Sequence, residues 1–300
     1  MSTVHWLGAG LSSLPGIRKV ALSGQKLVLW NRTLEKAQQA VTSLKIDIPV
    51  KQLDWSSLEQ EIQAGDVVIS MLPATMHVQV AEICLGHKAH FVSSSYVSEE
   101  MQALDAKAKS AGLSFVNEVG LDPGLDHLLA HALVAKYEAS DSFDKNNQHY
   151  FRSYCGGFPK VANEFKYKFS WSPLGVLKAL KSPAQWIGEG EIKRTEKPWL
   201  ALSDFDVTLA DGSQETFQAY PNRDSVPFQA QYGFANDWNV QEFVRGTLRL
   251  NGWAQAWDSL FTEVDTLPGD DGMARLQTIS DDLWANHQYD EGESDRVVLS

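Results

Sequence analysis

The chain has 300 residues, which at roughly 150 residues per domain predicts two domains. Hydrophobic residues make up 43% of the chain and charged residues 21%, a composition typical of folded globular proteins and not of disordered ones. Lysine and arginine number 26 against 38 acids, and the resulting formal charge of −12 argues against a nucleic-acid or anionic-membrane surface. The acids concentrate in residues 263–300, which hold ten acids and two bases.

Targeting segments and cysteine frameworks are not indicated. The first ten residues lack the basic stretch and apolar run of a signal peptide, and no apolar run approaches the roughly 20 residues that span a bilayer. The two cysteines, Cys84 and Cys155, are too few for a disulfide framework or a four-cysteine zinc site. We therefore expect a cytoplasmic protein without a membrane segment.

The first 120 residues alternate short apolar runs with helical patterns. We predict strands at 4–7, 26–30, 50–53, 67–72, 89–93 and 114–116, and helices at 33–44, 76–85 and 98–111. Glu99 and Glu100 would fill the first turn of the last helix, where the helix dipole favours acids. Strands that alternate with helices predict an α/β fold, a Rossmann-type doubly wound parallel sheet with right-handed crossovers.

A glycine-containing turn, GAGLSS at residues 8–13, follows the first strand and opens a helix. Gly8 permits the tight turn, and Gly10 lets the backbone approach a pyrophosphate at the helix N-terminus. Ser13 stands at the third glycine position and is small enough for close packing of helix on sheet. Between a strand and a helix this pattern predicts dinucleotide binding; the alternative is an ordinary tight turn.

The end of the second strand indicates which dinucleotide binds. NAD sites place an acid there, about 20 residues past the glycines, to bond the ribose 2′-hydroxyl. Here Asn31, Arg32 and Thr33 follow Trp30, and no acid is present. Because Arg32 can pair with a 2′-phosphate or stack on adenine, we expect NADP; the alternative is a solvated arginine at a helix start.

Two further strands end in small or hydroxyl residues. Leu72 and Pro73 follow the fourth strand, and Ser94 and Ser95 follow the fifth. Open α/β sheets bind ligands at the carboxyl ends of their strands, so these hydroxyls can meet a substrate carboxylate. Serines that follow a strand also commonly cap the next helix.

Residues 117–127 form the densest polar segment, where the sixth strand passes into the second domain. Asp122 precedes a proline and is disfavoured in a helix, which makes it the better site candidate, whereas Asp126 can be the N-cap of a helix at 125–137. His127 and His131 are four residues apart, but the glutamate of an HExxH zinc motif is missing. We therefore predict no metal site.

The alternation of strands and helices ends near residue 123, which divides the chain into domains 1–123 and 124–300. Strands are predicted at 204–209, 215–220 and 243–250, the first two joined by a hairpin at Asp211-Gly212. Seven of the ten tryptophans lie beyond residue 150. This pattern predicts an α+β substrate domain with a mostly antiparallel sheet.

Three segments of the second domain suit anions. Arg223 lies in a polar turn after a strand, and the period of two places Arg245, Thr247 and Arg249 on one strand face. Two arginines and a hydroxyl suit bidentate carboxylate binding, although charges on a strand also protect an exposed edge. Ser172 lies in the segment 169–173, where an aromatic wall and hydroxyl donors begin a helix; Trp171 is otherwise a core residue.

Several of these segments resemble one known family. The motifs NEVGLDPGLDH (117–127), SYCGGF (153–158), YKFSWSPLG (167–175), AYPNRDSVP (219–227) and RGTLR (245–249) occur in this order in the saccharopine dehydrogenase family. They match its L-glutamate-forming branch, also called saccharopine reductase. The segments WNRTLEKA (30–37), SSSYVS (93–98) and YDEGESDRVVL (289–299) are similar to that branch as well.

The resemblance implies an NADP-dependent oxidoreductase that interconverts saccharopine with glutamate plus 2-aminoadipate 6-semialdehyde in lysine metabolism. Its partner would be a small amino-acid substrate, with neither nucleic acid nor membrane, and a homodimer is compatible with it. The cofactor residues would be Gly8, Gly10, Leu11, Ser13, Asn31, Arg32, Thr33, Leu72 and Pro73. The substrate residues would be Ser94, Ser95, Asp122, Ser172, Arg223, Thr247 and Arg249, with Asp122 as the candidate catalytic residue.

The sequence also departs from the family pattern. Family members usually carry a longer insertion after the RGTLR strand and continue beyond the equivalent of Leu299, so the second domain is expected to be C-terminally short. Two alternatives stay open. One is a related amine dehydrogenase of the lysine or carboxynorspermidine type, and the other is a catalytically impaired NADP-binding sensor or interaction protein.

Overall fold

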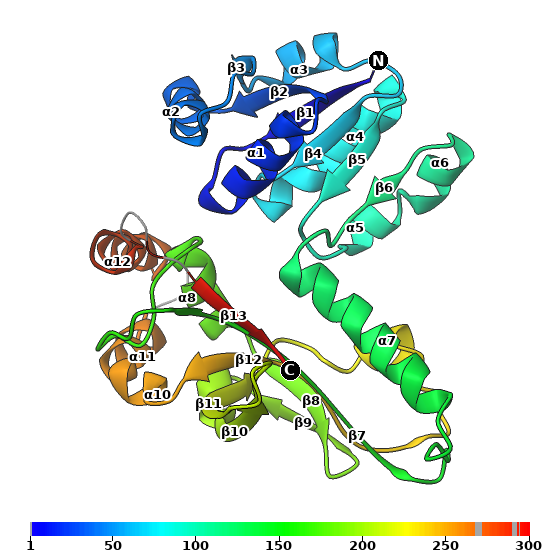
Figure 1. Cartoon of the computed structure of the whole chain (residues 1–300), viewed down its shortest axis with the longest axis vertical. Helices are drawn as coiled ribbons and strands as arrows, with labels where there is room; N and C mark the ends of the chain where they lie inside the picture. Colours follow the sequence, from blue (N-terminus) through cyan, green and yellow to red (C-terminus); the bar gives the residue numbers. More distant parts are fainter. Residues whose placement is uncertain (1, 268–271, 290–292, 294) are drawn as a thin grey trace. The chain divides into compact units, whose positions relative to one another are not determined.

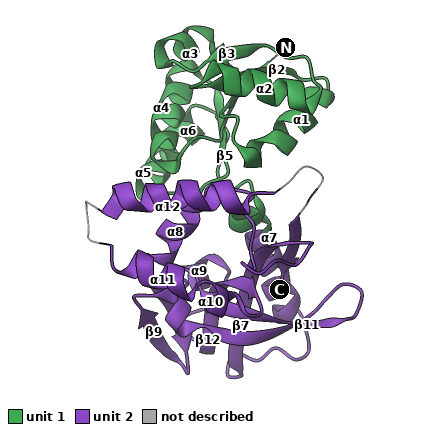
Figure 2. Cartoon of the chain, turned by 90° about the vertical axis from the view of Figure 1, so that its left-hand side faces the viewer, with its two compact units in different colours: residues 1–125 green, residues 126–300 purple. Residues whose placement is uncertain are grey.

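The computed structural model describes residues 2–267, 272–289, 293 and 295–300. Its two compact units are Met1–Leu125 and Asp126–Ser300 (Figure 2). Four residues of the segment 289–299, at positions 290–292 and 294, lie outside the described residues. In the described part of the chain, no helix is both long and apolar enough to span a bilayer.

The first unit alternates strands and helices along the chain (Figure 1). Its elements are β1 (Thr3–Leu7), η1 (Leu11–Ser13), α1 (Leu14–Leu22), β2 (Lys26–Asn31), α2 (Leu34–Leu44), β3 (Val50–Gln52), α3 (Trp55–Glu61), β4 (Val67–Ser70), η2 (Ala74–Met76), α4 (His77–His87), β5 (His90–Ser93), α5 (Glu99–Gln102), α6 (Asp105–Ser110) and β6 (Phe115–Val116). All strand pairs are parallel, in the order β3-β2-β1-β4-β5-β6. This is the doubly wound order of dinucleotide-binding domains, and the predicted fold class is confirmed.

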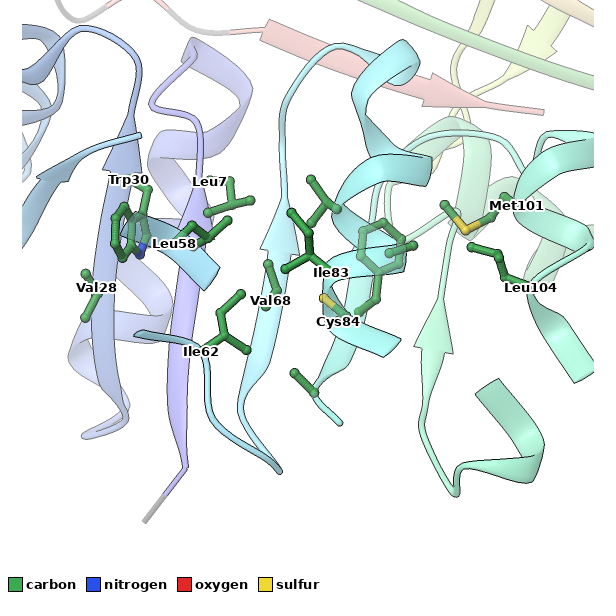
Figure 3. Close-up of a cluster of buried hydrophobic side chains, with 14 residues drawn as sticks. Leu7, Val28, Trp30, Leu58, Ile62, Val68, Ile83, Cys84, Met101 and Leu104 are labelled. Atoms are coloured by element: carbon green, nitrogen blue, oxygen red, sulfur yellow. The ribbon is translucent and has the colours of Figure 1, made fainter. Parts of the chain in front are cut away.

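Both faces of the first sheet are buried, which explains why its strands read as unbroken apolar runs. On one face Leu7, Val28 and Val68 pack with side chains of α3, α4 and α5 (Figure 3). On the other face Trp6 and Leu29 pack with residues of α1 and α2. Because successive strand residues alternate between the two cores, each strand is fixed from both sides and its carboxyl end is held in place.

The helix predicted over residues 98–111 is wrong as one element. Ser98 caps α5 by accepting a hydrogen bond from the N–H of Met101 at 3.2 Å, as the acids in the first turn indicated. The N–H of Leu104 then bonds to the carbonyl of Met101 at 3.1 Å, a three-residue spacing that tightens the chain and ends α5. α6 begins at Asp105, and no glycine or proline in the sequence marks this break.

The second unit carries a mixed sheet with helices. Its elements are α7 (Asp126–Glu138), β7 (Gln148–Pro159), α8 (Pro173–Leu180), β8 (Ala184–Gly188), β9 (Glu191–Thr195), η4 (Pro198–Ala201), β10 (Ser203–Thr208), β11 (Gln214–Pro221), α9 (Phe228–Gln231), β12 (Asn239–Leu250), α10 (Trp253–Ala256), α11 (Asp258–Asp265), α12 (Gly272–His287) and β13 (Asp295–Leu299). The main order is β10-β11-β12-β7-β13, and β8 pairs with both β12 and β9.

The strand pairs of this sheet are antiparallel except for β12 with β7, so the prediction of a mostly antiparallel sheet is confirmed for the described residues. The hairpin between β10 and β11 turns at Gly212, whose φ is +84°. β12 begins four residues earlier than predicted, at Asn239, and has an irregularity between Val240 and Glu242 that interrupts the alternation. It is a central strand, which contradicts the alternative of an exposed edge.

Candidate functional site

The loop after β1 has the backbone geometry of a phosphate-binding turn. Gly8 has a φ of +103°, and a Cβ there would lie 2.8 Å from the carbonyl oxygen of Met71. Its N–H donates to the carbonyl of Trp30 at 2.8 Å, which ties the loop to β2. Gly8 is therefore required by the fold itself.

Gly10 is different, because a Cβ built on it meets nothing within 4 Å. It immediately precedes η1, and the N–H groups at the start of a helix have no partner within that helix. Leu11 is exposed on the same turn, and Ser13 is buried with a hydroxyl that finds no hydrogen-bond partner in the described chain. Open space beside free N–H donors at a helix start fits a pyrophosphate.

The end of β2 completes the cofactor side. Asn31 accepts a hydrogen bond from the N–H of Ala9 at 3.2 Å and donates to the carbonyl of Thr33 at 2.8 Å, so it links the glycine loop to the β2–α2 turn. The side chain of Arg32 is exposed and makes no hydrogen bond or ion pair with any described residue. Its guanidinium is therefore available to a 2′-phosphate, and the residues present fit NADP.

Hydroxyl groups gather at the carboxyl ends of β4 and β5. Pro73 is exposed and Leu72 half-buried in the loop between β4 and η2. Ser94 and Ser95 are half-buried after β5, and the Ser95 hydroxyl lies 2.9 Å from Nε2 of His77. The sequence pattern did not single out His77. Its only signal is its position at the start of α4.

Asp122 lies in the irregular turn Leu121–Leu125, in an extended conformation with φ of −147°. Its carboxylate accepts a 2.6 Å hydrogen bond from the hydroxyl of Tyr96. Gly124 closes the turn with φ of +143°, and a Cβ there would lie 2.4 Å from the carbonyl oxygen of Glu118. The structure thus joins Asp122 to the SSSY segment, a contact that the sequence analysis missed.

In the second unit Arg249 is almost fully buried. Its Nη2 and Nε lie 2.8 and 3.2 Å from the hydroxyl oxygen of Tyr220. Its guanidinium carbon lies 5.0 Å from the ring centre of Tyr167 and 5.1 Å from that of Trp253. No described carboxylate pairs with it. Although burial by itself lowers the pKa of Arg249, the tyrosines raise it overall, so the group is a permanent cation.

Arg245 has a carboxylate within the chain. Its Nη2 lies 2.6 Å from Oδ2 of Asp126 at the start of α7, and both side chains are buried. Its guanidinium also lies over the ring of Phe228 at 4.0 Å. The strand face that carries Arg245 and Arg249 thus holds one arginine in a buried ion pair and one buried arginine without a described carboxylate partner.

The remaining candidates are spread over the second unit. Thr247 is half-buried on β12, opposite Tyr220 on one side and Cys155 on the other. Arg223 is exposed after β11 and has a left-handed φ of +53°. Ser172 caps α8 by accepting from the N–H of Gly175 at 3.3 Å. Trp171 is 45% exposed and lies against Gly175, so it is not a core residue.

His127 and His131 both contact one tyrosine, Tyr232. Nδ1 of His127 lies 2.7 Å from the hydroxyl of Tyr232, and the ring of His131 contacts the same tyrosine edge-on. Among the described residues, no group of three or more histidines, cysteines and acids is arranged to hold a metal ion.

A hollow of about 680 Å³ on the second unit contains none of these candidates. It is lined by Tyr150, Trp186, Gly188, Glu189, Lys193, Arg194, Gln241 and Glu242. Its charges pair locally, as in the 2.9 Å contact of Lys193 with Glu189, so it presents no free anion-binding group.

The strand order of the first sheet and the glycine turn after β1 define the class: an α/β protein with a Rossmann-type dinucleotide-binding domain followed by a mixed-sheet domain. Residues 4–116 match the family model of the saccharopine dehydrogenase NADP binding domain, and residues 120–300 match that of the saccharopine dehydrogenase C-terminal domain. The chain belongs to the saccharopine dehydrogenase family. The predictions of the family and of an NADP-binding domain are confirmed.

Relatives and solved structures agree with the family. The chain is 37% identical over 258 residues to a saccharopine dehydrogenase [NADP(+), L-glutamate-forming] of Pyricularia oryzae, covering 84% of this chain and 55% of that protein. It is 34% identical over 254 residues to the protein of the same name from Saccharomyces cerevisiae, covering 83% and 55%. The solved apo saccharopine dehydrogenase (L-Glu forming) of S. cerevisiae superposes with a TM-score of 0.78 at 26% identity, covering 100% of this chain and 80% of that one. The chain thus spans about half the length of these two curated relatives.

Proposed function

We propose that the chain is an NADP-dependent oxidoreductase that acts on a C–N bond and interconverts saccharopine with glutamate plus 2-aminoadipate 6-semialdehyde. The observation that carries this proposal is Arg249, a buried cation with no carboxylate partner among the described residues. Saccharopine carries three carboxylates, and a guanidinium held in an aromatic surround is a suitable partner for one of them.

The proposed cofactor residues are those of the β1 and β2 turns. Gly10 leaves room for the pyrophosphate, the N–H groups of Leu11 and Ser12 would donate to it, and Arg32 would pair with the 2′-phosphate. The bound dinucleotide would supply the hydride chemistry: NADPH would give a hydride to the imine carbon, and in the reverse direction NADP+ would accept it from the same carbon of saccharopine. The protein's own contribution is then mainly to hold the reacting carbon in position and to exclude water.

The proposed substrate residues are Ser94, Ser95, Asp122, Ser172, Arg223, Thr247 and Arg249. Imine formation and hydrolysis require a proton to move to or from water, and Asp122 is the proposed group for this step. Its hydrogen bond to Tyr96 supports that role, because the phenol fixes the carboxylate and provides a second exchangeable proton.

One assay tests the proposal. NADPH oxidation is followed with 2-aminoadipate 6-semialdehyde plus glutamate, and NADP reduction is followed with saccharopine, lysine or carboxynorspermidine. Turnover of saccharopine in either direction supports the proposal. Turnover of lysine or carboxynorspermidine alone identifies a related amine dehydrogenase, and tight NADPH binding without any turnover identifies a sensor. Location in the cytoplasm and assembly as a homodimer belong to the same proposal, and are tested by cell fractionation and analytical ultracentrifugation.

A further inference from the structure

A chain of three polar side chains crosses the carboxyl end of the first sheet. His77 begins α4 and is buried, with a ring edge against Phe91. Its Nδ1 lies 2.9 Å from the hydroxyl of Ser70, the last residue of β4, and its Nε2 lies 2.9 Å from the hydroxyl of Ser95. Both ring nitrogens are therefore committed to hydroxyl oxygens.

The protons in this chain can be counted. Burial lowers the pKa of His77, so its ring is neutral near pH 7, with one N–H donor and one lone pair. If Nδ1 carried the proton, Nδ1–H would donate to Ser70, and the Ser70 hydroxyl proton would need another acceptor. Ser70 is fully buried, and its hydroxyl contacts only His77 among the described side chains. That arrangement leaves a buried donor unsatisfied, which is strongly unfavourable.

The other tautomer satisfies the protons of both buried side chains, Ser70 and His77. Ser70 donates its hydroxyl proton to Nδ1, and Nε2–H donates to the oxygen of Ser95. The proton of the Ser95 hydroxyl must then point away from His77. No described side chain accepts it, and Ser95 is half-buried at the edge where open α/β sheets bind ligands.

We infer that His77 is a positioning residue that fixes the Ser95 hydroxyl as a hydrogen-bond donor to an anionic oxygen of the substrate. The opposite tautomer would turn a Ser95 lone pair outward and favour an ammonium group. This inference rests on the proposed function, because it assigns to Ser95 a carboxylate of the amino-acid substrate. Discrimination between carboxylate and ammonium at this point would thus be set by Ser70, whose hydroxyl contacts only His77 among the described side chains.

The first test requires no turnover. The ¹⁵N chemical shifts of the histidine rings are measured in the uniformly labelled chain, and the His77 signals are assigned by their loss in His77→Gln. We expect protonated Nε2 and unprotonated Nδ1 at pH 7. Proton on Nδ1, or a doubly protonated ring, would overturn the inference whatever the substrate proves to be.

The second test is a double-substitution cycle. In His77→Leu, KM for saccharopine should rise roughly tenfold, with kcat and the Kd for NADPH within about twofold of the unsubstituted chain. In a Ser95→Ala background the same change should alter KM by less than about twofold, because His77 acts through Ser95. His77→Gln, whose amide can donate to Ser95, should restore part of the loss.

An equal rise of KM in both backgrounds would contradict the inference. If the unsubstituted chain turned over no saccharopine, the proposed function would fail, while the tautomer measurement would still decide the inference. If the tautomer were wrong in a chain that turned over saccharopine, only the inference would fail.

Discussion

The carboxylate of Asp126 and the guanidinium of Arg245 are joined by a 2.6 Å hydrogen bond, and each side chain is less than a tenth exposed. Four residues further along β12, Arg249 is buried as deeply but faces tyrosines and a tryptophan instead of a described carboxylate. Two arginines on one strand face therefore have different surroundings, a carboxylate for Arg245 and aromatic rings for Arg249. Arg245 is paired with a carboxylate of the fold, and Arg249 has no carboxylate partner among the described residues.

Methionine at each position should separate these roles. Arg245→Met leaves Asp126 buried without its partner and should lower the free energy of unfolding by about 3–5 kcal/mol. Arg249→Met removes a buried cation and should leave stability unchanged or slightly raised, while KM for saccharopine rises roughly 100-fold. Urea denaturation and steady-state kinetics measure both effects. Equal destabilisation by the two substitutions would show that Arg249 is structural.

Alanine substitutions at Gly8 and Gly10 should separate an effect on stability from an effect on NADPH binding. Gly8→Ala places a Cβ against the Met71 carbonyl at a positive φ and should cost about 2 kcal/mol or more of stability. Gly10→Ala meets no protein atom, so stability should change by less than about 1 kcal/mol, while the Kd for NADPH rises about tenfold. NADPH fluorescence titration and thermal unfolding provide the measurements. Unchanged NADPH affinity in Gly10→Ala would contradict pyrophosphate binding at this turn.

Arg32 should determine the preference for NADPH over NADH. Arg32→Ala is expected to weaken NADPH binding about tenfold or more, because a charge-assisted contact to the 2′-phosphate is lost, and to leave NADH binding within twofold. Arg194→Ala is the matched control, since Arg194 is exposed in the second unit and pairs with Glu196. Equal weakening of both dinucleotides would refute a 2′-phosphate contact.

Asp122→Asn should lower turnover more than it lowers NADPH affinity. Loss of the carboxylate removes a proton acceptor during imine formation, so kcat should fall about tenfold or more, with the Kd for NADPH within twofold. Tyr96→Phe keeps the carboxylate but removes its 2.6 Å donor, and should show a smaller fall in kcat. Glu100→Gln, at an exposed position on α5, is the control for loss of an acid. Turnover unchanged in Asp122→Asn would exclude Asp122 from the reaction.

The free energy of unfolding should decrease in two steps as the pH is lowered. Burial lowers the pKa of His5, His77 and His287 below 6.5. As the pH falls from 7 to 5, these histidines therefore bind protons more readily in the unfolded chain than in the folded chain. The free energy of unfolding decreases over this range. Burial alone would raise the pKa of Asp66, but hydrogen bonds from Thr3, Gln63 and His5 lower it below 3.8. Its contribution is present above pH 3.8 and disappears below.

His77→Gln tests the contribution of His77 to the loss of stability between pH 7 and 5. The dependence of the urea midpoint on pH between 7 and 5 should be less steep than in the unsubstituted chain, because a histidine with a lowered pKa is removed. A slope that is identical in His77→Gln would contradict the shift at His77.

The sequence predicted the first unit well because its local rules are strong. Strands buried on both faces appear as unbroken apolar runs, as in Leu27–Trp30, and Gly8 follows the first strand directly, which makes the turn readable although its steric cause, the Met71 carbonyl, lies far along the chain. The alternation along β12 also placed Arg245, Thr247 and Arg249 on one face. What the alternation cannot supply is the partner, because Asp126 lies 119 positions from Arg245.

Other features depend on contacts that leave no local pattern. His77 meets Ser95 only because β4 and β5 end side by side, and Tyr96 meets Asp122 across a turn whose shape is set by Gly124. Trp171 lies against Gly175 and is 45% exposed, which the sequence pattern did not indicate. Each is a property of three-dimensional neighbours and not of spacing along the chain.

β7 pairs in parallel with β12 along Gln148–Cys155 and antiparallel with β13 along Cys155–Pro159. During synthesis on the ribosome, β7 therefore emerges long before either partner strand. Pro159, for example, cannot pair until Asp295 has been made. During that interval its edges and the aromatic residues around them are exposed, whereas the first unit already has all its strands. We expect the second unit to fold later and more slowly, and to be the part of the chain that chaperones hold during synthesis.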